Sequence, residues 1–348
     1  MRYFPLFSDS GFSISDVTKF NNSCFKIRQN HNEYDHFRFI DNPFSSIKSD
    51  FIYCVENDGK YIAQMLTMPA PLSLNEEVIP AFWGQDYYVL EEYRNKGIGK
   101  KLADYYLKND YYIAVGFSEK SARIHQDRGA KVISHLNFYL KWGSIFHRLK
   151  FLTQRVFRMP PKDIKSYQFP DNIGRFQRIK DAAQLNLSTL NWNKNVIETL
   201  RDKRYFQWRF FYKPDRYFFY ISSSSLDENP TYFVAKPYFY KGVNWLKIVD
   251  YRFNNHKINE FTAILMSAEL LRKKLKLYGT IISSSQNITD QWLSEHFFTQ
   301  FKHEVVLTTF PFNFKNTQET HDHLVMSFAD SDLDMHSNLG KFNYAEDY

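Results

Sequence analysis

One order of strand and helix patterns occurs twice in this sequence, and this repetition restricts the fold more than any other feature. The first half predicts a strand hairpin, a long strand, a helix, a short apolar strand, a helix and a strand, at 49–70, 78–90, 98–108, 111–117, 118–128 and 130–142. The second half predicts the same order at 216–240, 244–253, 258–277, 278–285, 287–298 and 303–312. Strands that alternate with helices predict an α/β fold with a mixed sheet in each half.

A segment that begins at Asp86 can be aligned with one that begins at Asp250, mostly by pattern and with little identity. We interpret the match as a tandem duplication of one fold, although two unrelated α/β domains would give a similar order. A length of 348 residues is compatible with two domains. The predicted division is a first domain, a linker, a second domain and a C-terminal tail, at 1–150, 151–174, 175–328 and 329–348.

Two further regions have helical patterns. Residues 14–46, which precede the first hairpin, predict one or two helices. Residues 191–211, which precede the second hairpin, predict another helix.

The connection between the long strand and the helix of the first half has an unusual composition. Its sequence, RNKGIGK, places Gly97 and Gly99 among the cations Arg94, Lys96 and Lys100, directly before the helix. Glycine lets backbone N–H groups approach a ligand closely, and a helix N-terminus adds free N–H donors and partial positive charge. These residues therefore predict a binding site for a pyrophosphate; a tight turn without a ligand is the alternative.

The second half lacks these features. In the alignment, Phe261 and Ala263 occupy the positions of Gly97 and Gly99. The strand and helix patterns are nevertheless retained, so the fold does not need the glycines if the alignment is right. A ligand that binds only in the first half would explain them.

Two common phosphate-binding patterns, GxxxxGK[ST] and GxGxxG, do not occur here. The Arg-x-x-Gly-x-Gly pattern between a strand and a helix instead resembles the acyl-CoA motif of the GNAT superfamily of N-acetyltransferases. The segment GFSEKSARIHQDRGAKVI, at 116–133, resembles the later strand and helix of that superfamily. The resemblance covers roughly residues 50–140. It implies two tandem GNAT-like domains, of which the second is degenerate.

The resemblance also implies a cosubstrate, acetyl-CoA or a related acyl-CoA, and residues that hold it. The backbone of the matching turn would bind the pyrophosphate, through Arg94, Asn95, Lys96, Gly97, Ile98, Gly99 and Lys100. The end of the preceding strand would pair with the pantetheine arm as an added strand does, through Tyr88, Val89 and Leu90. A backbone N–H there would polarise the thioester carbonyl.

Acyl transfer needs a neutral amine and a stabilised thiolate. Asp86 lies eight residues before Arg94, where GNAT members often carry an acid, and is the candidate base. The alternative is an Asp that pairs with a cation or is held by the backbone. His125 lies four residues before Gly129, where many members carry the Tyr that protonates the thiolate. An imidazolium can donate a proton near neutral pH; a packed or surface His is the alternative.

Four further residues are candidates for contact with the acceptor substrate. Trp83 and Tyr87 lie beside the candidate base in the sequence, although such aromatic residues more often belong to a core. In the second half, Trp208 and Arg209 would suit an anionic ligand that carries a ring. The alternative, a helix anchored in a core by Trp208, is favoured.

The C-terminal segment ADSDLDM carries acidic residues at alternate positions, Asp330, Asp332 and Asp334. It lacks the Gly and the distal Glu of a calcium-binding loop, and we expect a solvated tail. An acidic rim around an amine substrate is the alternative.

The predicted identity of the acceptor substrate rests on the resemblance alone. Tandem GNAT proteins with a similar 116–130 segment are associated with bacterial surface-polysaccharide synthesis, which implies a small amine acceptor, a nucleotide-linked amino sugar. Other amines remain open: an amino acid, a polyamine, an antibiotic or a protein lysine. A protein that binds acyl-CoA without turnover is a further alternative, because His125 departs from the usual Tyr.

The composition limits the kinds of binding partner that we expect. A net charge of +7 is modest for this length, so we expect an anionic small ligand rather than a nucleic acid.

The spacing of Cys24 and Cys54 predicts neither a disulfide scaffold nor a metal site. The sequence shows no signal peptide and no span of about 18 apolar residues, so we expect a cytoplasmic protein without membrane insertion. The sequence does not predict an oligomeric state.

Overall fold

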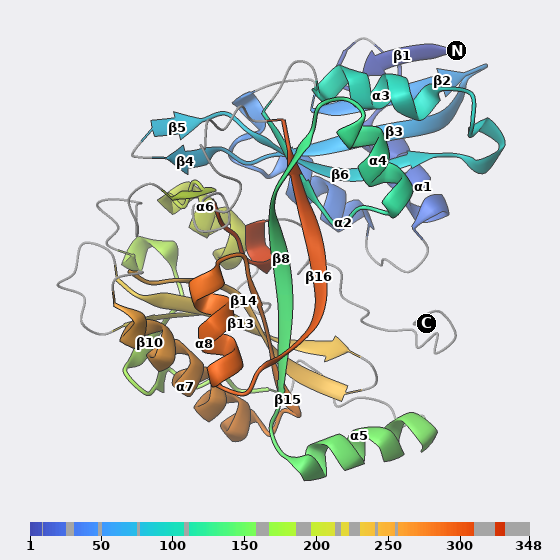
Figure 1. Cartoon of the computed structure of the whole chain (residues 1–348). Helices are drawn as coiled ribbons and strands as arrows, with labels where there is room; N and C mark the ends of the chain where they lie inside the picture. The colour runs from blue at the N-terminus through green and yellow to red at the C-terminus, as the bar shows by residue number, and fades with distance from the viewer. Residues whose placement is uncertain are drawn as a thin grey trace. The chain divides into compact units, whose positions relative to one another are not determined.

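The computed structural model describes residues 1–8, 10–25, 31–47, 51–74, 77–107, 111–157, 167–185, 196–212, 217–222, 230–240, 243–254, 257–309 and 324–330. The chain divides into two compact units, which we describe separately. Unit 1 comprises Met1–His135 and Glu304–His321, and unit 2 comprises Leu136–His303 and Asp322–Tyr348. Figure 1 shows the elements of both units in chain order.

Unit 1 contains a mixed sheet in the order β1-β2-β3-β6-β7-β16. Neighbouring strands are antiparallel except for the parallel pair β6 and β7. Its strands are β1 Arg2–Pro5, β2 Ile52–Asn57, β3 Lys60–Pro69, β6 Phe82–Val89, β7 Tyr112–Val115 and the end of β16 Thr299–Thr308, with a separate hairpin of β4 Leu72–Leu74 and β5 Glu77–Ile79. Its helical elements are α1 Ile14–Cys24, α2 His31–Asp35, the π-helical turn η1 His36–Ile40, the 3-10 turns η2 Ser45–Ile47 and η3 Glu91–Tyr93, α3 Ile98–Leu107 and α4 Glu119–Gln126.

The helices of unit 1 cover both faces of its sheet. On one face, Ile98, Leu102 and Tyr106 of α3 pack in an apolar cluster with residues of β2 and β3. On the other face, Val17 of α1 and Phe39 of η1 pack in a second cluster with β1, β2 and β6. The spacing of the α3 residues is that of one helix face, as expected from the sequence.

Unit 2 contains a mixed sheet in the order β8-β15-β14-β13-β12-β10-β9, in which only β14 and β15 are parallel. Its strands are β8 Lys131–Trp142, β9 Asn172–Ile173, β10 Phe176–Ile179, β12 Phe218–Ser222, β13 Tyr232–Tyr240, β14 Val243–Arg252 and β15 Gly279–Ser284, with a separate parallel pair of β11 Ile197–Thr199 and β17 Leu324–Val325. Its helical elements are α5 Ile145–Phe157, η5 Ala182–Gln184, α6 Lys203–Phe206, the π-helical turn η6 Gln207–Phe211, α7 Ile258–Leu275, α8 Asn287–Glu295 and η7 Phe328–Asp330.

Both units have the same central topology. Three antiparallel strands, β2-β3-β6 or β12-β13-β14, are followed by a helix and then by a strand parallel to the third. The mixed α/β fold predicted for each half is thereby confirmed. The shared topology supports a tandem duplication, and the domain boundaries taken from the sequence stay a prediction.

The last strand of each half completes the sheet of the other unit, which the sequence analysis did not predict. Val306, Leu307 and Thr308 of β16 pair with β7 in unit 1. Asn137 to Trp142 of β8 pair with β15 in unit 2. Leu307 is fully buried in the cluster that contains α3, so the exchanged segment is part of the core of unit 1.

Two predicted elements differ from the structure. The pattern at 191–211 favoured one helix, but among the residues described there Ile197–Thr199 forms β11, and α6 with η6 follows only from Lys203. The β-branched Ile197 and Thr199 suit the strand. Residues up to Phe157 of the expected linker are helical, because Ser144 caps α5 by accepting a hydrogen bond from the His147 N–H at 3.2 Å.

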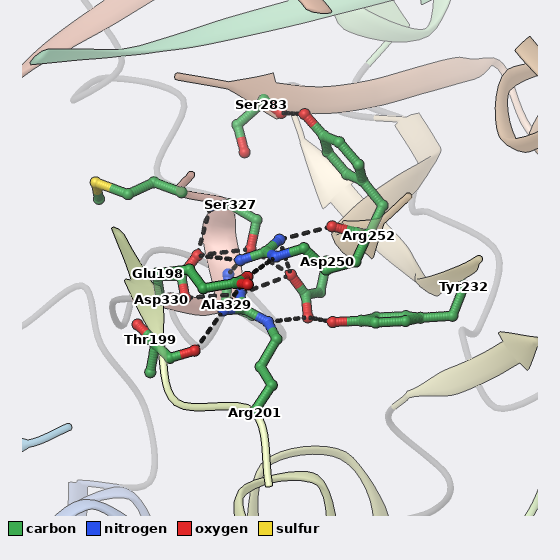
Figure 2. Close-up of polar contacts among 12 residues, drawn as sticks. Glu198, Thr199, Arg201, Tyr232, Asp250, Arg252, Ser283, Ser327, Ala329 and Asp330 are labelled. Atoms are coloured by element: carbon green, nitrogen blue, oxygen red, sulfur yellow. Dashed lines mark hydrogen bonds and ion pairs between the residues drawn. The ribbon is translucent and has the colours of Figure 1, made fainter. Parts of the chain in front are cut away.

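The C-terminal segment of unit 2 is held by buried ion pairs (Figure 2). We call Glu198, Arg201, Asp250, Arg252 and Asp330 the buried arginine cluster. The Arg201 Nη2 atom lies 3.0 Å from Asp250 and 2.7 Å from Asp330, and Arg252 lies 3.0 Å from Asp250. Burial alone would raise the pKa of Asp250, but both arginines hold it down to about 2.

The expectation of a solvated tail from residue 329 is therefore wrong for the two residues of it that are described. Ala329 and Asp330 are both buried, each with 1% exposure. The alternate acidic spacing suggested solvent, whereas Asp330 pairs with Arg201, which lies 129 positions away in the sequence. Asp332 and Asp334 lie outside the described residues.

Candidate active site

Strands β6 and β7 separate soon after they begin. Among the described residues they pair only at Phe82 with Tyr112 and at Trp83 with Ile113. A Cβ atom at the next residue, Gly84, would collide with the Tyr112 ring, so glycine lets that ring lie against β6. The Tyr112 ring in turn stacks on His125 of α4. The Tyr112 ring therefore lies between β7 and the second half of β6. Among the described strands, that half of β6 pairs with β3 alone.

The connection from β6 to α3 contains two residues with unusual backbone conformations. Asn95 and Gly97 both have left-handed backbones, with φ values of 63° and 78°. Glycine and Asn tolerate this conformation best. A Cβ atom at Gly97 would meet nothing within 4 Å, so this position faces open space at the start of α3. The Arg94 side chain folds back onto β6 and donates to the Val89 carbonyl at 3.1 Å.

A pocket of about 710 Å³ lies between the end of β6, this connection and the start of α4. Among the predicted cosubstrate residues, those that line it are Tyr88, Val89, Arg94, Asn95, Gly97, Ile98, Gly99 and Lys100. Leu90 and Lys96 do not line it, and the Lys96 ammonium instead lies 5.0 Å from the centre of the Tyr93 ring. The lining contains three cations, Arg94, Lys100 and Lys120, and no Asp or Glu.

The sequence analysis missed the α4 side of the pocket. Ser118, Lys120, Ser121 and Ile124 line it. Ser118 caps α4, because its hydroxyl accepts a hydrogen bond from the Ser121 N–H. The sequence did contain a signal for this side of the pocket, which is the helix cap Ser118 close to Lys120. A helix start with a lysine presents positive charge to an anion.

Asp86 lies in a buried ion pair at a bulge of β6. Its backbone is left-handed, with a φ of 40°, and Gln64 and Leu66 of β3 shift register opposite this point. Its carboxylate accepts a hydrogen bond at 2.7 Å from the Arg38 guanidinium, and both side chains are fully buried. Arg38 also pairs with Asp35 at 2.6 Å. Asp86 does not line the pocket, and the cation partner is the alternative that the sequence left open.

His125 is fully buried beside the pocket, with both ring nitrogens engaged. Its Nδ1 atom lies 2.8 Å from the Ser121 carbonyl oxygen, so that nitrogen carries the proton. Its Nε2 atom then accepts from the Tyr112 hydroxyl at 3.2 Å. Burial lowers the pKa of His125 below its usual range, and the nearby Arg128 lowers it further. The imidazole is therefore neutral near pH 7.

Tyr87 lines the pocket, and its hydroxyl is buried without a hydrogen-bond partner among the described residues. A Cβ atom at Gly99 would collide with this hydroxyl, so the second glycine leaves room for it. Burial raises the pKa of Tyr87 to about 12, which keeps the phenol protonated. Trp83, in contrast, is 1% exposed and does not line the pocket.

Trp208 and Arg209 lie in the core of unit 2. They are 4% and 1% exposed, and Arg209 donates to the Ala329 carbonyl oxygen at 3.1 Å and to the Tyr217 hydroxyl at 3.2 Å. Their burial matches the favoured alternative, a helical segment anchored in a core. Their contact with a substrate stays a prediction.

Unit 2 replaces the glycine turn with helix. Strand β14 ends at Arg252 and α7 already begins at Ile258, whereas eight residues, 90–97, separate β6 from α3. Phe261 lies in the first turns of α7 and is fully buried in the core of unit 2. Its side chain therefore fills space within the fold, whereas the position of Gly97 in unit 1 faces open space.

Comparison with known protein families identifies the class of this protein. Residues 14–141 match the model of the acetyltransferase (GNAT) family. The matched range contains every residue that lines the pocket. Residues 14–141 form a GNAT acetyltransferase domain, which confirms the resemblance of the first half to this superfamily, and the protein is an acyltransferase. Comparison with curated protein sequences gives no match.

Solved structures with the same fold extend over both halves of the chain. A GCN5-related N-acetyltransferase from Anabaena variabilis has a TM-score of 0.56 and 12% identity, over 88% of this chain and 72% of that one. Saccharomyces cerevisiae N-myristoyltransferase with bound myristoyl-CoA has a TM-score of 0.57 and 13% identity, over 98% and 84%. A probable N-acyltransferase from Enterococcus faecalis has a TM-score of 0.57 and 11% identity, over 88% and 71%. At these identities the likeness concerns the fold.

The described residues show neither a candidate metal site nor a membrane-spanning helix. No group of three or more His, Cys, Asp or Glu side chains there is placed to hold a metal ion. None of the helices described is long and apolar enough to cross a membrane.

Proposed function

We propose that the pocket of unit 1 binds an acyl-CoA, with acetyl-CoA as the first candidate, and that the protein transfers the acyl group to the amine of a small acceptor. One observation carries the proposal: a pocket with three cations and no carboxylate lies inside the GNAT domain, at a helix start beside a strand with an open edge. A pyrophosphate suits this charge and these N–H donors.

The pantetheine arm needs the open edge of β6. The wedge of Tyr112 against Gly84 supports this role, because it parts β6 from β7 and leaves backbone groups available for an added strand. Tyr88, Val89 and Leu90 are the proposed partners. A backbone N–H of this strand would polarise the thioester carbonyl as an oxyanion hole does.

The leaving thiolate needs a hydrogen-bond donor. His125 was the sequence candidate, but its one proton is donated to the Ser121 carbonyl oxygen. Tyr87 offers a protonated hydroxyl without a protein partner in the described part of the chain, and it lines the pocket. We therefore assign to Tyr87 the hydrogen bond to the bound cosubstrate that the resemblance would have given to His125.

The acceptor amine need not lose its proton to Asp86. The Asp86 carboxylate lies 2.7 Å from the Arg38 guanidinium in a buried ion pair and does not line the pocket. This geometry supports the structural alternative for Asp86. An amine that enters neutral needs no protein base, and the rate then rises with pH as the free amine loses its proton.

For the acceptor we propose a nucleotide-linked amino sugar, as the sequence resemblance implies. The test is release of free thiol from acetyl-CoA with a panel of UDP- and dTDP-linked amino sugars, an amino acid, a polyamine and a lysine peptide. We expect turnover with at least one amino sugar. Turnover only with another amine would contradict the acceptor class, and CoA binding without turnover on any amine would favour a binding protein.

A further inference from the structure

Helix α5 exposes large apolar side chains. Ile145 is 71% exposed, Phe146 77%, Leu149 54% and Leu152 51%. Isolated exposed apolar residues are common on protein surfaces, but here four belong to two turns of one helix. We call these four residues the apolar stripe of α5.

The stripe lies on one side of the helix. With about 100° of rotation per residue, Ile145, Leu149 and Leu152 fall within about 60° of one another, and Phe146 borders them. The opposite side faces unit 2, where His147 lies 5.3 Å from the Tyr278 ring and Phe151 lies 5.3 Å from the Trp142 ring. The helix is thus attached through one side while the stripe faces solvent. In Figure 1, α5 extends from the end of β8.

The segment of sequence that contains the stripe is basic. Residues 128–162 contain no Asp or Glu and eight cations, Arg128, Lys131, Lys141, Arg148, Lys150, Arg155, Arg158 and Lys162. Among the cations of α5 whose side chains are described, Arg148 is exposed and by helical phase follows one border of the stripe. A large apolar side flanked by Lys and Arg is the pattern of helices that lie in the interface of an anionic membrane.

We propose that α5 binds the surface of an anionic lipid bilayer, with the apolar stripe among the acyl chains and Arg148 at the headgroups. The charge favours lipid over a second copy of this chain, because two such helices packed face to face would bring like charges together. Lys and Arg side chains near an anionic surface add to the affinity for it. The proposal does not depend on the acyl-CoA site.

The test is co-sedimentation of the full chain with vesicles. One set contains phosphatidylglycerol and phosphatidylcholine in equal parts, and the other contains phosphatidylcholine alone. We expect binding to the first set, with a partition coefficient about tenfold or more above that for the second, and loss of most of this preference at about 1 M salt, where the Debye length is about 3 Å.

The double variant Phe146→Glu with Leu149→Glu replaces two apolar side chains of the stripe with negatively charged ones. We expect its partition coefficient for the anionic vesicles to fall about tenfold or more. The matched control is Met266→Glu with Leu270→Glu, which changes two exposed apolar residues of α7, 62% and 48% exposed, and should bind as the wild type does. Circular dichroism and CoA binding check that each variant is folded. Arg148→Gln is a milder second variant, with a smaller loss expected.

Three results would overturn the proposal. The first is wild-type binding that does not prefer the anionic vesicles. The second is an equal loss of binding in the α5 and α7 variants. The third is a dimer in light scattering that the α5 variant converts to a monomer, because a second copy of the chain would then cover the stripe.

Discussion

At the scale of single residues, the pocket contains a hydrogen-bond donor, the Tyr87 hydroxyl, that has no partner among the described residues. A buried hydroxyl without a partner costs about 1–3 kcal/mol of stability. Tyr87 keeps such a hydroxyl beside Gly99, in the wall of the pocket. A group that does not stabilise the free protein is best explained by what it does for a ligand.

The variant Tyr87→Phe tests this explanation. We expect the melting temperature to stay the same or rise, because the unsatisfied hydroxyl is removed. The affinity for CoA or acetyl-CoA should fall about threefold to tenfold, the value of one hydrogen bond of about 0.5–1.5 kcal/mol. Calorimetric titration and thermal melting measure the two effects.

Tyr220→Phe is the matched control, because the Tyr220 hydroxyl donates to the Pro170 carbonyl oxygen at 2.8 Å in unit 2. This control should lower the melting temperature and leave CoA affinity unchanged. Unchanged CoA affinity in Tyr87→Phe would refute the assignment.

His125 predicts a pH dependence of stability. Burial depresses its folded pKa below the ordinary 6.5, so the unfolded state binds the proton more readily. The stabilisation is fully present above pH 6.5 and is lost as the pH falls from there through the lower folded pKa. The difference in melting temperature between wild type and His125→Gln should therefore shrink between about pH 7 and pH 5.

Melting curves of both proteins at half-unit pH intervals would check this. A difference that stays constant or grows towards low pH contradicts a neutral, buried imidazole. If His125 instead donates the proton to the thiolate, the variant loses turnover while CoA affinity is kept.

At the scale of elements, the two halves separate features of the fold from features of the site. Both place an Asp at a bulge of the third strand, Asp86 in β6 and Asp250 in β14, and both pair it with a buried arginine. Only unit 1 has the glycine turn. The ion-paired Asp is therefore a feature common to both halves, whereas the turn lines the pocket of unit 1.

Matched variants Asp86→Asn and Asp250→Asn test this distinction. Each removes one partner of a buried ion pair, so we expect each to lower the free energy of unfolding by about 3 kcal/mol. The pH profile of kcat for Asp86→Asn should keep its shape. If the ionisation of a base instead disappears from the pH profile of kcat in Asp86→Asn, with little change in stability, Asp86 is the proton acceptor after all.

The sequence predicted the helices and strands better than it predicted contacts between residues far apart in the chain. The helical spacing of Ile98, Leu102 and Tyr106 and the glycines of the turn are local signals, and α3 and the pocket lie where they indicated. Whether Asp86 meets a substrate or Arg38 depends on a contact across 48 positions, which no local pattern encodes. The same limit applies to Asp330, which a local acidic pattern placed in solvent and a distant arginine buries.

At the scale of the whole molecule, the exchanged strands make each half depend on the other for its core. Leu307 belongs to the apolar cluster under α3, although it lies near the end of the sequence. Without Val306 to Thr308, strand β7 would be an open edge of the unit 1 sheet. The GNAT domain matched at 14–141 thus lacks one strand of the unit 1 sheet.

A fragment of residues 1–150 tests this dependence. We expect it to be aggregated, or to melt at a temperature lower by about 10 °C or more, because burial of Leu307 and three strand pairs is lost. Adding a peptide of residues 299–309 in trans should raise the melting temperature. A fragment that melts cooperatively at the temperature of the full chain would show that the exchange is dispensable.

The central claim is that the Gly97 turn binds the pyrophosphate of an acyl-CoA, and calorimetric titration of CoA into Gly97→Phe tests it most directly. Gly59→Phe is the control, because Gly59 has nearly the same φ, 76° against 78°, and equally open space, but lies in the β2–β3 turn outside the pocket. Both variants carry the same backbone strain, about 1–2 kcal/mol. We predict that Gly97→Phe lowers CoA affinity about tenfold or more while Gly59→Phe binds as the wild type does; equal affinities in all three proteins would contradict the site.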